Sequence, residues 1–317
     1  MKILGVGSAL PKTTVTNEDL AAFLDTTDEW IVSRTGIKSR QVLRDETLLS
    51  LGIEAGRAAL ERAGVEPSQI DFLICTTLMG DTVSPGLGCL LVGALGLSCA
   101  AVDVNGACAG FVYGLDMADA YIASGKAKKI LIVSAEANTR ICDWSDRSTA
   151  VLFGDGAGAL VVGEGEGYLG SILTVQPNID VLNYWPHAGN SPYAKDFQHA
   201  YQALYMMGQE VYKFAVSAVV RDLKNVCART GIMVEQIDKF VLHQANLRII
   251  EAARQRLKQP PEKFPHNIEH TGNTSSASVP ILLDEMIKAG ELREGMLLLI
   301  SAFGAGLTTG TCLLRWG

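Results

Sequence analysis

The sequence predicts an α/β protein built from a duplicated unit. Short β-branched apolar runs, such as 71–77 and 129–134, alternate with longer segments of helical period, such as 47–63. Two separate windows of the first half are repeated in the second half at one common spacing. The 317 residues are 48% hydrophobic, which is enough to bury a core shared by two packed units.

The repeat is seen most clearly when the two pairs of windows are aligned. Residues 62–77 (RAGVEPSQIDFLICTT) match 229–244 (RTGIMVEQIDKFVLHQ), 167 positions later, in Arg, Gly, Gln, Ile and Asp. Residues 129–135 (KILIVSA) match 296–302 (MLLLISA) at the same spacing. We therefore expect two similar α/β halves.

The predicted halves are residues 1–166, with the candidate nucleophile, and 167–317, packed as one body. Strands and helices are expected to alternate in the first half. Its elements are a strand over 3–8, a helix capped by Thr16 or Asn17, a short helix from 27, a helix over 47–63 ended by Gly64, strands over 71–77 and 129–134, a helix over 86–95 and a strand–turn–strand segment over 150–167.

The stretch 101–125 contains the candidate nucleophile, Cys108. A short strand turns through Asn105 and Gly106, and an apolar helix then runs to Gly125. A helix N-terminus presents unpaired N–H groups and a positive dipole end, so we expect this position to favour thiolate over thiol. The alternative is a buried, inert cysteine, which behaves as a small apolar residue.

The repeat predicts which residues lie opposite Cys108. The position equivalent to Cys108 is Ser275, in a second polar turn followed by an apolar helix, and Asn273 lies two residues before it. Thr76, at the end of a first-half strand, corresponds to His243. Strand ends and helix N-termini face a common crevice in such folds, so we expect Cys108, His243 and Asn273 to meet there.

These three side chains suit acyl transfer. Cysteine is a nucleophile, and a neutral His243 Nε2–H and the Asn273 amide can both donate to an oxygen that becomes negative. The N–H groups of Cys108 and of Ala305, within the glycine turn 304–306, are candidates for an oxyanion hole. The alternatives are a histidine satisfied in the core, an asparagine that caps a helix and an ordinary strand turn.

Composition argues against several other classes of protein. The net charge is −7 and no long run of like charge occurs, so we expect no nucleic-acid surface. No apolar run approaches the ~20 residues that span a bilayer, and the start is too short and glycine-broken for a signal peptide. Seven scattered cysteines without a CxxC pair argue against structural zinc and for reduced thiols, hence a cytoplasmic protein without a metal.

Five motifs extend these observations over the whole chain. They are DEWIVSRTGI (28–37), ACAGF (107–111), DRSTAVLFGDGAGA (146–159), HQANLR (243–248) and GNTSSASVP (272–280). In sequence, order and spacing they resemble β-ketoacyl-acyl-carrier-protein synthase III, the initiating condensing enzyme of type II fatty acid synthesis. The resemblance implies the thiolase fold, an internally duplicated, five-layered αβαβα body that is usually homodimeric.

The resemblance also implies a reaction and the roles of three residues. Cys108 takes the acyl group from an acyl-CoA primer, and malonyl-acyl carrier protein then enters and loses carbon dioxide with the help of His243 and Asn273. The resulting carbanion attacks the acyl-cysteine and gives 3-oxoacyl-acyl carrier protein. No cofactor is implied, because acyl-CoA is a substrate.

Binding residues are likewise carried over from the resemblance. Trp30 and Arg147 match positions that sandwich the CoA adenine. Arg34 and Arg248 match positions near the CoA phosphates and the pantetheine entrance, and Asn246 lies beside them. Trp30 is otherwise a core or interface aromatic. The basic residues Arg248, Arg254 and Arg256 lie on one predicted helix and would dock the acidic carrier protein; the alternative is a solvated helix face.

Two regions bear on the choice of primer. Ser84, before Pro85, stands where the family often has a bulky aromatic that closes the partner subunit's acyl pocket, so longer or branched primers are expected. Phe303, beside the glycine turn, is assigned to the same pocket. The aromatic-rich stretch 183–202 is either a flap over the tunnel or a surface loop.

Three other functions remain open at this level. The first is a condensing enzyme of secondary metabolism that uses a CoA-bound extender. The second is a Cys/His/Asn thioester hydrolase. The third is a non-catalytic acyl-binding or scaffold protein.

Overall fold

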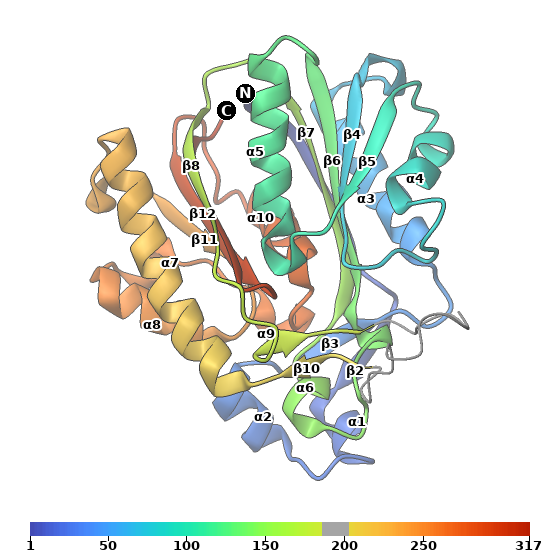
Figure 1. Cartoon of the computed structure of the whole chain (residues 1–317), viewed down its shortest axis with the longest axis vertical. Coiled ribbons are helices and arrows are strands. Elements are labelled where there is room, and N and C mark those ends of the chain that lie inside the picture. Colours follow the sequence, from blue (N-terminus) through green and yellow to red (C-terminus); the bar gives the residue numbers. More distant parts are fainter. Residues whose placement is uncertain (186–202) are drawn as a thin grey trace.

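The computed structural model describes residues 1–185 and 203–317, which form five layers (Figure 1). Two β-sheets lie on either side of a central pair of helices, and further helices cover the outer face of each sheet. This helix–sheet–helix–sheet–helix order is the αβαβα architecture expected from the sequence.

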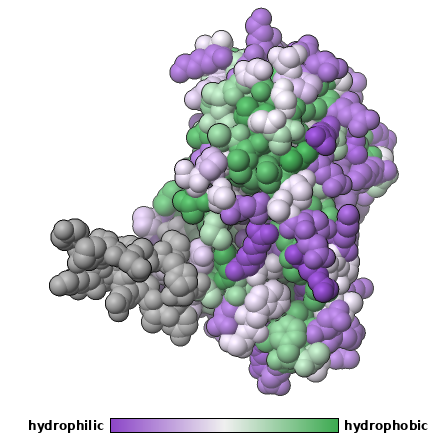
Figure 2. Space-filling view, turned by 90° about the vertical axis from the view of Figure 1, so that its right-hand side faces the viewer, coloured by the Kyte–Doolittle hydropathy of each residue, from purple (hydrophilic) through white to green (hydrophobic). Residues whose placement is uncertain are grey.

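The first sheet consists of five strands, in the spatial order β1 (Lys2–Ala9), β7 (Asp155–Gly163), β6 (Lys129–Ala137), β4 (Phe72–Thr76) and β5 (Ala100–Val104). β4 is parallel to β5 and β6, whereas β7 is antiparallel to β6 and β1. The central strands β6 and β7 are buried along almost their whole length, as expected for strands covered on both faces. The edge strand β5 is half exposed, and apolar side chains gather on the upper half of this side of the molecule (Figure 2).

The second sheet consists of four strands, in the order β11 (Lys239–Leu242), β12 (Leu297–Gly304), β13 (Thr308–Arg315) and β8 (Tyr168–Val175). β11 and β12 are parallel, and the other two pairs are antiparallel. Two short ladders lie outside the main sheets: β2 (Thr13–Thr16) with β3 (Ser39–Val42), and β9 (Leu182–Asn183) with β10 (Tyr205–Met206).

The long helices occupy the three helical layers. The central layer holds α5 (Gly110–Ala123) and α10 (Ser278–Lys288), the first sheet is covered by α3 (Leu48–Ala63) and α4 (Leu87–Leu95), and the second by α7 (Gly208–Thr230) and α8 (Leu247–Leu257) (Figure 1). The packing is close: a Cβ on Gly7 of β1 would lie 2.4 Å from the Ala55 carbonyl oxygen of α3. Buried clusters of apolar side chains fill the spaces between the layers.

The remaining elements are short. They are α1 (Asn17–Ala21), α2 (Asp28–Thr35), α6 (Arg147–Ala150), α9 (Ile268–Thr271) and the 3₁₀ turns η1 (Pro67–Gln69), η2 (Ala107–Ala109), η3 (Asn138–Arg140), η4 (Val234–Gln236), η5 (Pro261–Lys263) and η6 (Ser275–Ala277). Among the described residues, every helix is too short or too polar to cross a membrane.

The equivalent elements of the two halves follow the predicted spacing. β4 and β11 begin 167 positions apart, at Phe72 and Lys239, and occupy corresponding places beside β6 and β12. η2 precedes α5 as η6 precedes α10. The chain passes from the first sheet to the second between Gly163 and Tyr168, and we place the boundary of the two proposed halves there.

Most predicted elements are present, with one correction. Thr16 caps α1, and α3 is ended by Gly64 in the left-handed conformation (φ 61°). The strand–turn–strand prediction for 150–167 is wrong: α6 and a turn precede the single strand β7, whose apolar run is continuous because α3 and α10 cover its two faces. The prediction for 183–202 falls almost wholly on residues outside the described part of the chain.

Candidate active site

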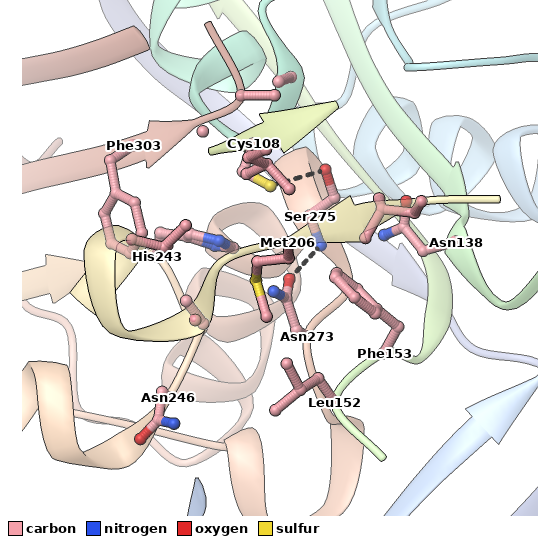
Figure 3. A pocket seen from close by; sticks show the side chains of 18 of the residues that line it. Cys108, Asn138, Leu152, Phe153, Met206, His243, Asn246, Asn273, Ser275 and Phe303 are labelled. Carbon is pink, nitrogen blue, oxygen red and sulfur yellow. Dashed lines mark hydrogen bonds between the residues drawn. The ribbon is translucent and has the colours of Figure 1, made fainter. Parts of the chain in front are cut away.

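One cavity of about 1090 Å³ brings together the three predicted catalytic residues. Cys108 comes from η2, His243 follows β11, and Asn273 precedes η6. In Figure 3 the thiol, the imidazole and the carboxamide gather around a common space. The repeat therefore predicted their meeting correctly, because each half places its strand end and its elbow at the same crevice.

Cys108 sits in a strained turn just before α5. The preceding residue, Ala107, has a positive φ of 47°, which is costly for a residue with a Cβ. Burial raises the pKa of the Cys108 thiol to about 12. The hydrogen bond from the Ser275 hydroxyl lowers this pKa, and the negative charge of Glu136 raises it further. The expectation of a lowered pKa is thus wrong for the resting thiol. A helix N-terminus contributes only about 1 kcal/mol, and α5 begins two residues later.

His243 is a buried, neutral imidazole. Its ring is 2% exposed and meets Phe303 edge-on at 5.3 Å, and burial lowers its pKa to about 3. Nδ1 lies 2.7 Å from the Ser278 hydroxyl, which accepts from the Gln244 N–H at 3.3 Å. The Ser278 proton is therefore directed to Nδ1, and the ring proton is left on Nε2 as a donor.

Asn273 is held so that its amide NH₂ faces the cavity. Oδ1 accepts from the Ser275 N–H at 2.8 Å, and the backbone of Asn273 bonds Leu152 and Gly154. Since Oδ1 is occupied, the group presented to the cavity is the Nδ2 donor (Figure 3). Helix capping, the alternative for this residue, is not the role of its side chain, because Oδ1 bonds only within the turn.

Polar groups that were not predicted from the sequence lie behind the nucleophile. Ser275 Oγ lies 3.2 Å from Cys108 Sγ and 3.1 Å from Oε1 of Glu136. The repeat did locate Ser275 as the counterpart of Cys108, but it gave no reason to assign it chemistry. Glu136 could have been singled out from the sequence, because it is an acidic residue near the end of the apolar run that forms the buried strand β6.

The glycine turn closes against the nucleophile. A Cβ on Gly304 would lie 2.6 Å from the Cys108 nitrogen, so only glycine permits this approach. Gly304, Ala305 and Gly306 all line the cavity. This places the turn beside Cys108, as a backbone oxyanion hole requires.

Trp30 stands at one side of the cavity between two guanidinium groups. Arg34 lies 4.9 Å and Arg147 lies 5.1 Å from the ring centroid. Arg147 also pairs with Asp25. Asn246 lines the cavity and also has a structural role. Its side chain caps α8 and donates a hydrogen bond to the Arg34 carbonyl oxygen at 3.0 Å.

The basic residues of α8 differ in their surroundings. Arg248 lines the cavity and lies over the Tyr212 ring at 5.7 Å. Arg256 is exposed. Arg254 is held by Glu251 and by the Gln259 carbonyl, so its charge is largely compensated within the helix.

The two residues assigned to the acyl pocket lie apart. Phe303 lines the cavity beside His243. Ser84 lies on an exposed loop next to the β5 edge and does not line the cavity of its own chain. The resemblance assigns the Ser84 position to a partner subunit's pocket, so its role depends on a dimer. Apolar lining comes instead from residues such as Leu78, Phe153 and Met206.

The described part of the chain holds no cluster of His, Cys, Asp or Glu suited to a metal ion. The site thus consists of a thiol, two neutral donors, backbone N–H groups and one buried carboxyl. Such a set can transfer an acyl group and stabilise an oxyanion.

Comparisons with known proteins agree with this chemistry. The family models for 3-oxoacyl-[acyl-carrier-protein (ACP)] synthase III and for its C-terminal region match residues 102–178 and 227–316. A beta-ketoacyl-[acyl-carrier-protein] synthase III of Xanthomonas campestris is 44% identical over 99% of this chain and 98% of that protein.

Solved structures resemble the whole chain. The beta-ketoacyl-[acyl carrier protein] synthase III of Thermus thermophilus is 42% identical, with a TM-score of 0.93 over 100% of this chain and 99% of that one. The priming beta-ketosynthase of the R1128 polyketide pathway is 36% identical, with a TM-score of 0.93 over 99% and 96% of the two chains.

The neutral state of His243 is directly measurable. We expect the ring ¹⁵N resonances to show a proton on Nε2, with no titration between pH 5 and 8, because burial lowers the pKa to about 3. The unfolded chain binds a proton here below pH 6.5 and the folded chain does not, so this residue makes stability rise with pH between about 3 and 6.5. Ser278→Ala is the control, and it should mix the two tautomers. A ring that titrates near pH 6.5 would contradict the assignment.

Proposed function

The chain belongs to the β-ketoacyl-acyl-carrier-protein synthase III family, and we propose that Cys108, His243 and Asn273 carry out the family's reaction. That reaction is the decarboxylative condensation of an acyl-CoA primer with malonyl-acyl carrier protein, which initiates fatty acid synthesis. The observation that carries the proposal is the meeting of one thiol and two neutral N–H donors in a single cavity.

In the first half-reaction the Cys108 thiolate attacks the thioester carbonyl of acyl-CoA. The carbonyl oxygen becomes negative, and we assign the N–H groups of Cys108 and Ala305 as its donors, because both residues line the cavity and the glycine turn packs against the Cys108 nitrogen. The S–C bond to CoA then breaks, leaving an acyl-cysteine. One nucleophile serving two substrates in turn implies ping-pong kinetics.

In the second half-reaction malonyl-acyl carrier protein enters the same cavity and loses carbon dioxide. The electron pair of the broken C–C bond moves to the thioester oxygen as an enolate. Nε2–H of His243 and Nδ2–H of Asn273 stabilise that oxygen, each typically by a few kcal/mol in a site shielded from water. The enolate carbon attacks the acyl-cysteine, and 3-oxoacyl-acyl carrier protein leaves without any cofactor.

The hydrolase alternative fits the site less well. A papain-like pair needs a thiolate beside an imidazolium. Here the thiol bonds Ser275, and burial keeps His243 neutral. The scaffold alternative does not account for two neutral donors that line the same cavity as a thiol.

The mouth of the cavity suits CoA. The Trp30 ring and the nearby guanidinium groups of Arg34 and Arg147 supply an aromatic group and two cations for the adenine and the phosphates. Asn246 also lines this cavity. Arg248 and Arg256 form the proposed docking patch for the acidic carrier protein, without Arg254, whose charge is compensated.

A homodimer formed through the β5 edge is part of the proposal, as is a cytoplasmic location. β5 has one unpaired edge, and such an edge is a ready template for another strand. Val102 on this strand is 36% exposed and Val83 on the adjacent loop is 90% exposed. Figure 2 shows the apolar surface on this side. A partner here would put the Ser84 loop near the neighbouring cavity.

Activity is tested with a panel of acyl-CoA primers from two to eight carbons, straight and branched, and malonyl-acyl carrier protein. We expect carbon dioxide and a 3-oxo product. Asn273→Ala should lower condensation by about 10²–10³-fold while acyl transfer to Cys108 persists, because only the enolate donor is lost. Asn225→Ala, on the exposed side of α7, is the matched control. A 3-oxo product from a Cys108→Ala variant, or hydrolysis alone in the wild type, would overturn the proposal.

Carrier-protein docking is tested by charge reversal at the patch. Arg248→Glu should raise the KM for malonyl-acyl carrier protein about tenfold at low salt and affect acyl-CoA hydrolysis less, since a charge at an interface rim mainly changes association. Lys224→Glu makes the same charge change on α7, away from the cavity mouth, and should alter neither value. Equal losses with both substrates would contradict docking.

The dimer is tested by light scattering after size-exclusion chromatography. The wild type should run at twice the mass of the 33.9 kDa chain. Val102→Lys should shift the population to monomer, because a lysine on an edge strand opposes strand pairing. Val175→Lys, an exposed valine on β8 of the other sheet, serves as the control. A monomeric wild type would refute this interface.

A further inference from the structure

Glu136 is a buried carboxyl group directly behind the nucleophile. It lies near the end of β6, is 1% exposed and forms no ion pair among the described residues. Oε2 accepts from the Leu78 N–H at 3.0 Å, and Oε1 accepts from Ser276 and Ser275. Burial destabilises the ionised form of an acid whose hydrogen-bond partners are all neutral. The proposed roles of Cys108, His243 and Asn273 do not involve Glu136.

Within the described part of the chain, Ser275 is the one residue that hydrogen-bonds both this carboxyl and the thiol. Its Oγ lies 3.2 Å from Cys108 Sγ and 3.1 Å from Glu136 Oε1. The backbone of Ser275 has a positive φ of 51°, so the turn holds a non-glycine residue in a strained conformation with its hydroxyl between the two groups. Figure 3 shows the side chain directed at the thiol.

Proton counting limits the states of this trio. A serine hydroxyl has one proton to donate, whereas a thiolate and a carboxylate both need a donor. If Ser275 donates to the thiolate, its lone pair faces Glu136 Oε1 at 3.1 Å, and this contact is favourable only when Oε1 carries a proton. The thiolate and the carboxylate therefore compete for the single Ser275 proton, even though Ser276 and Leu78 also donate to Glu136.

We propose that Cys108 and Glu136 share one proton through the Ser275 hydroxyl, and that the reactive thiolate forms when this proton moves onto Glu136. The Sγ proton passes to Ser275 Oγ as the Ser275 proton passes to Glu136 Oε1. The net charge of the trio does not change. In the product state Glu136 donates to Ser275 and Ser275 donates to the thiolate. Glu136 thus acts through Ser275 as a positioning and proton-holding residue.

The proton balance closes over the whole reaction. This inference rests on the proposed role of Cys108 as nucleophile. When Sγ bonds the acyl carbon, CoA leaves as a thiolate and takes a proton from water, while Glu136 keeps the thiol proton. When condensation breaks the S–acyl bond, Cys108 leaves as a thiolate and recovers that proton through Ser275.

The surroundings allow this exchange near neutral pH. Burial raises the pKa of Glu136 to about 7, against four donors that lower it. Its charge acts on two thiols, Cys108 and Cys75 on β4, and burial holds the pKa of Cys75 far above neutral pH. On β7, Gly156 lies opposite Glu136, and Asp155 is engaged by Thr139 and Leu43. His243 lines the same cavity as a neutral ring.

The test is the pH profile of Cys108 alkylation by iodoacetamide, followed on the Cys108 peptide by mass spectrometry. Above about pH 7 the resting and reactive forms of the wild type hold the same number of protons. The pKa of Glu136 is about 7 beside a neutral thiol, and the charge of an adjacent thiolate raises it further, so the reactive form keeps its proton. The wild-type rate should therefore change by less than about twofold between pH 7.5 and 9. In Glu136→Gln the proton must go to solvent, so the rate should rise about tenfold per pH unit, or roughly 30-fold over this range.

Two serine variants distinguish the loss of the Ser275 hydrogen-bond link from a general effect on folding. Ser275→Ala removes the link and should give the rising profile of Glu136→Gln, even if the latter folds poorly. Ser276→Ala removes a donor to Glu136 that does not touch Cys108, so the plateau should persist and begin at higher pH. A wild-type rate that rises tenfold per pH unit, or a plateau retained without Glu136 or Ser275, would overturn the proposal. The assay uses neither acyl-CoA nor carrier protein, so its outcome is independent of the condensation test.

Discussion

The two elbows of the duplicated fold, η2 and η6, pack against each other at the centre of the molecule. Cys108 and Ser275, which are 167 positions apart, meet there at 3.2 Å. Glycines allow the approach: Gly110 lies against Thr76 and Ser276, and Gly304 lies against the Cys108 nitrogen. Because this contact joins equivalent points of the two halves, any change in their relative position would displace the thiol from its donors.

Burial at that contact decides the electrostatics of the site. It makes His243 neutral, raises the pKa of Cys108 and raises the pKa of Glu136. The same burial strengthens the hydrogen bonds that an enolate would receive, because such bonds are stronger in a low-dielectric interior than in bulk water. A thiol that is hard to ionise at rest is thus combined with donors that act strongly once negative charge reaches the cavity.

The cavity changes character from its mouth to its floor. Its mouth carries cations and an aromatic ring, Arg34, Arg248 and Trp30, which suit a charged nucleotide and an acidic protein. Its interior is lined by apolar side chains such as Leu78 and Phe153, which suit an acyl chain. The reacting atoms lie between these regions, so each substrate is held by the part that matches its chemistry while its thioester reaches Cys108.

The α/β class, the duplication and the meeting of Cys108, His243 and Asn273 follow from the amino-acid sequence alone. Periodicity and a repeated spacing are local properties of the chain, and equivalent elements of two similar halves occupy equivalent places. The state of these three groups, in contrast, depends on tertiary contacts. The pKa of Cys108, the tautomer of His243 and the coupling of Glu136 to Ser275 depend on burial and on contacts between distant residues. For the same reason the dipole argument for a thiolate failed, because desolvation of Cys108 arises from segments that its own neighbours in sequence do not reveal.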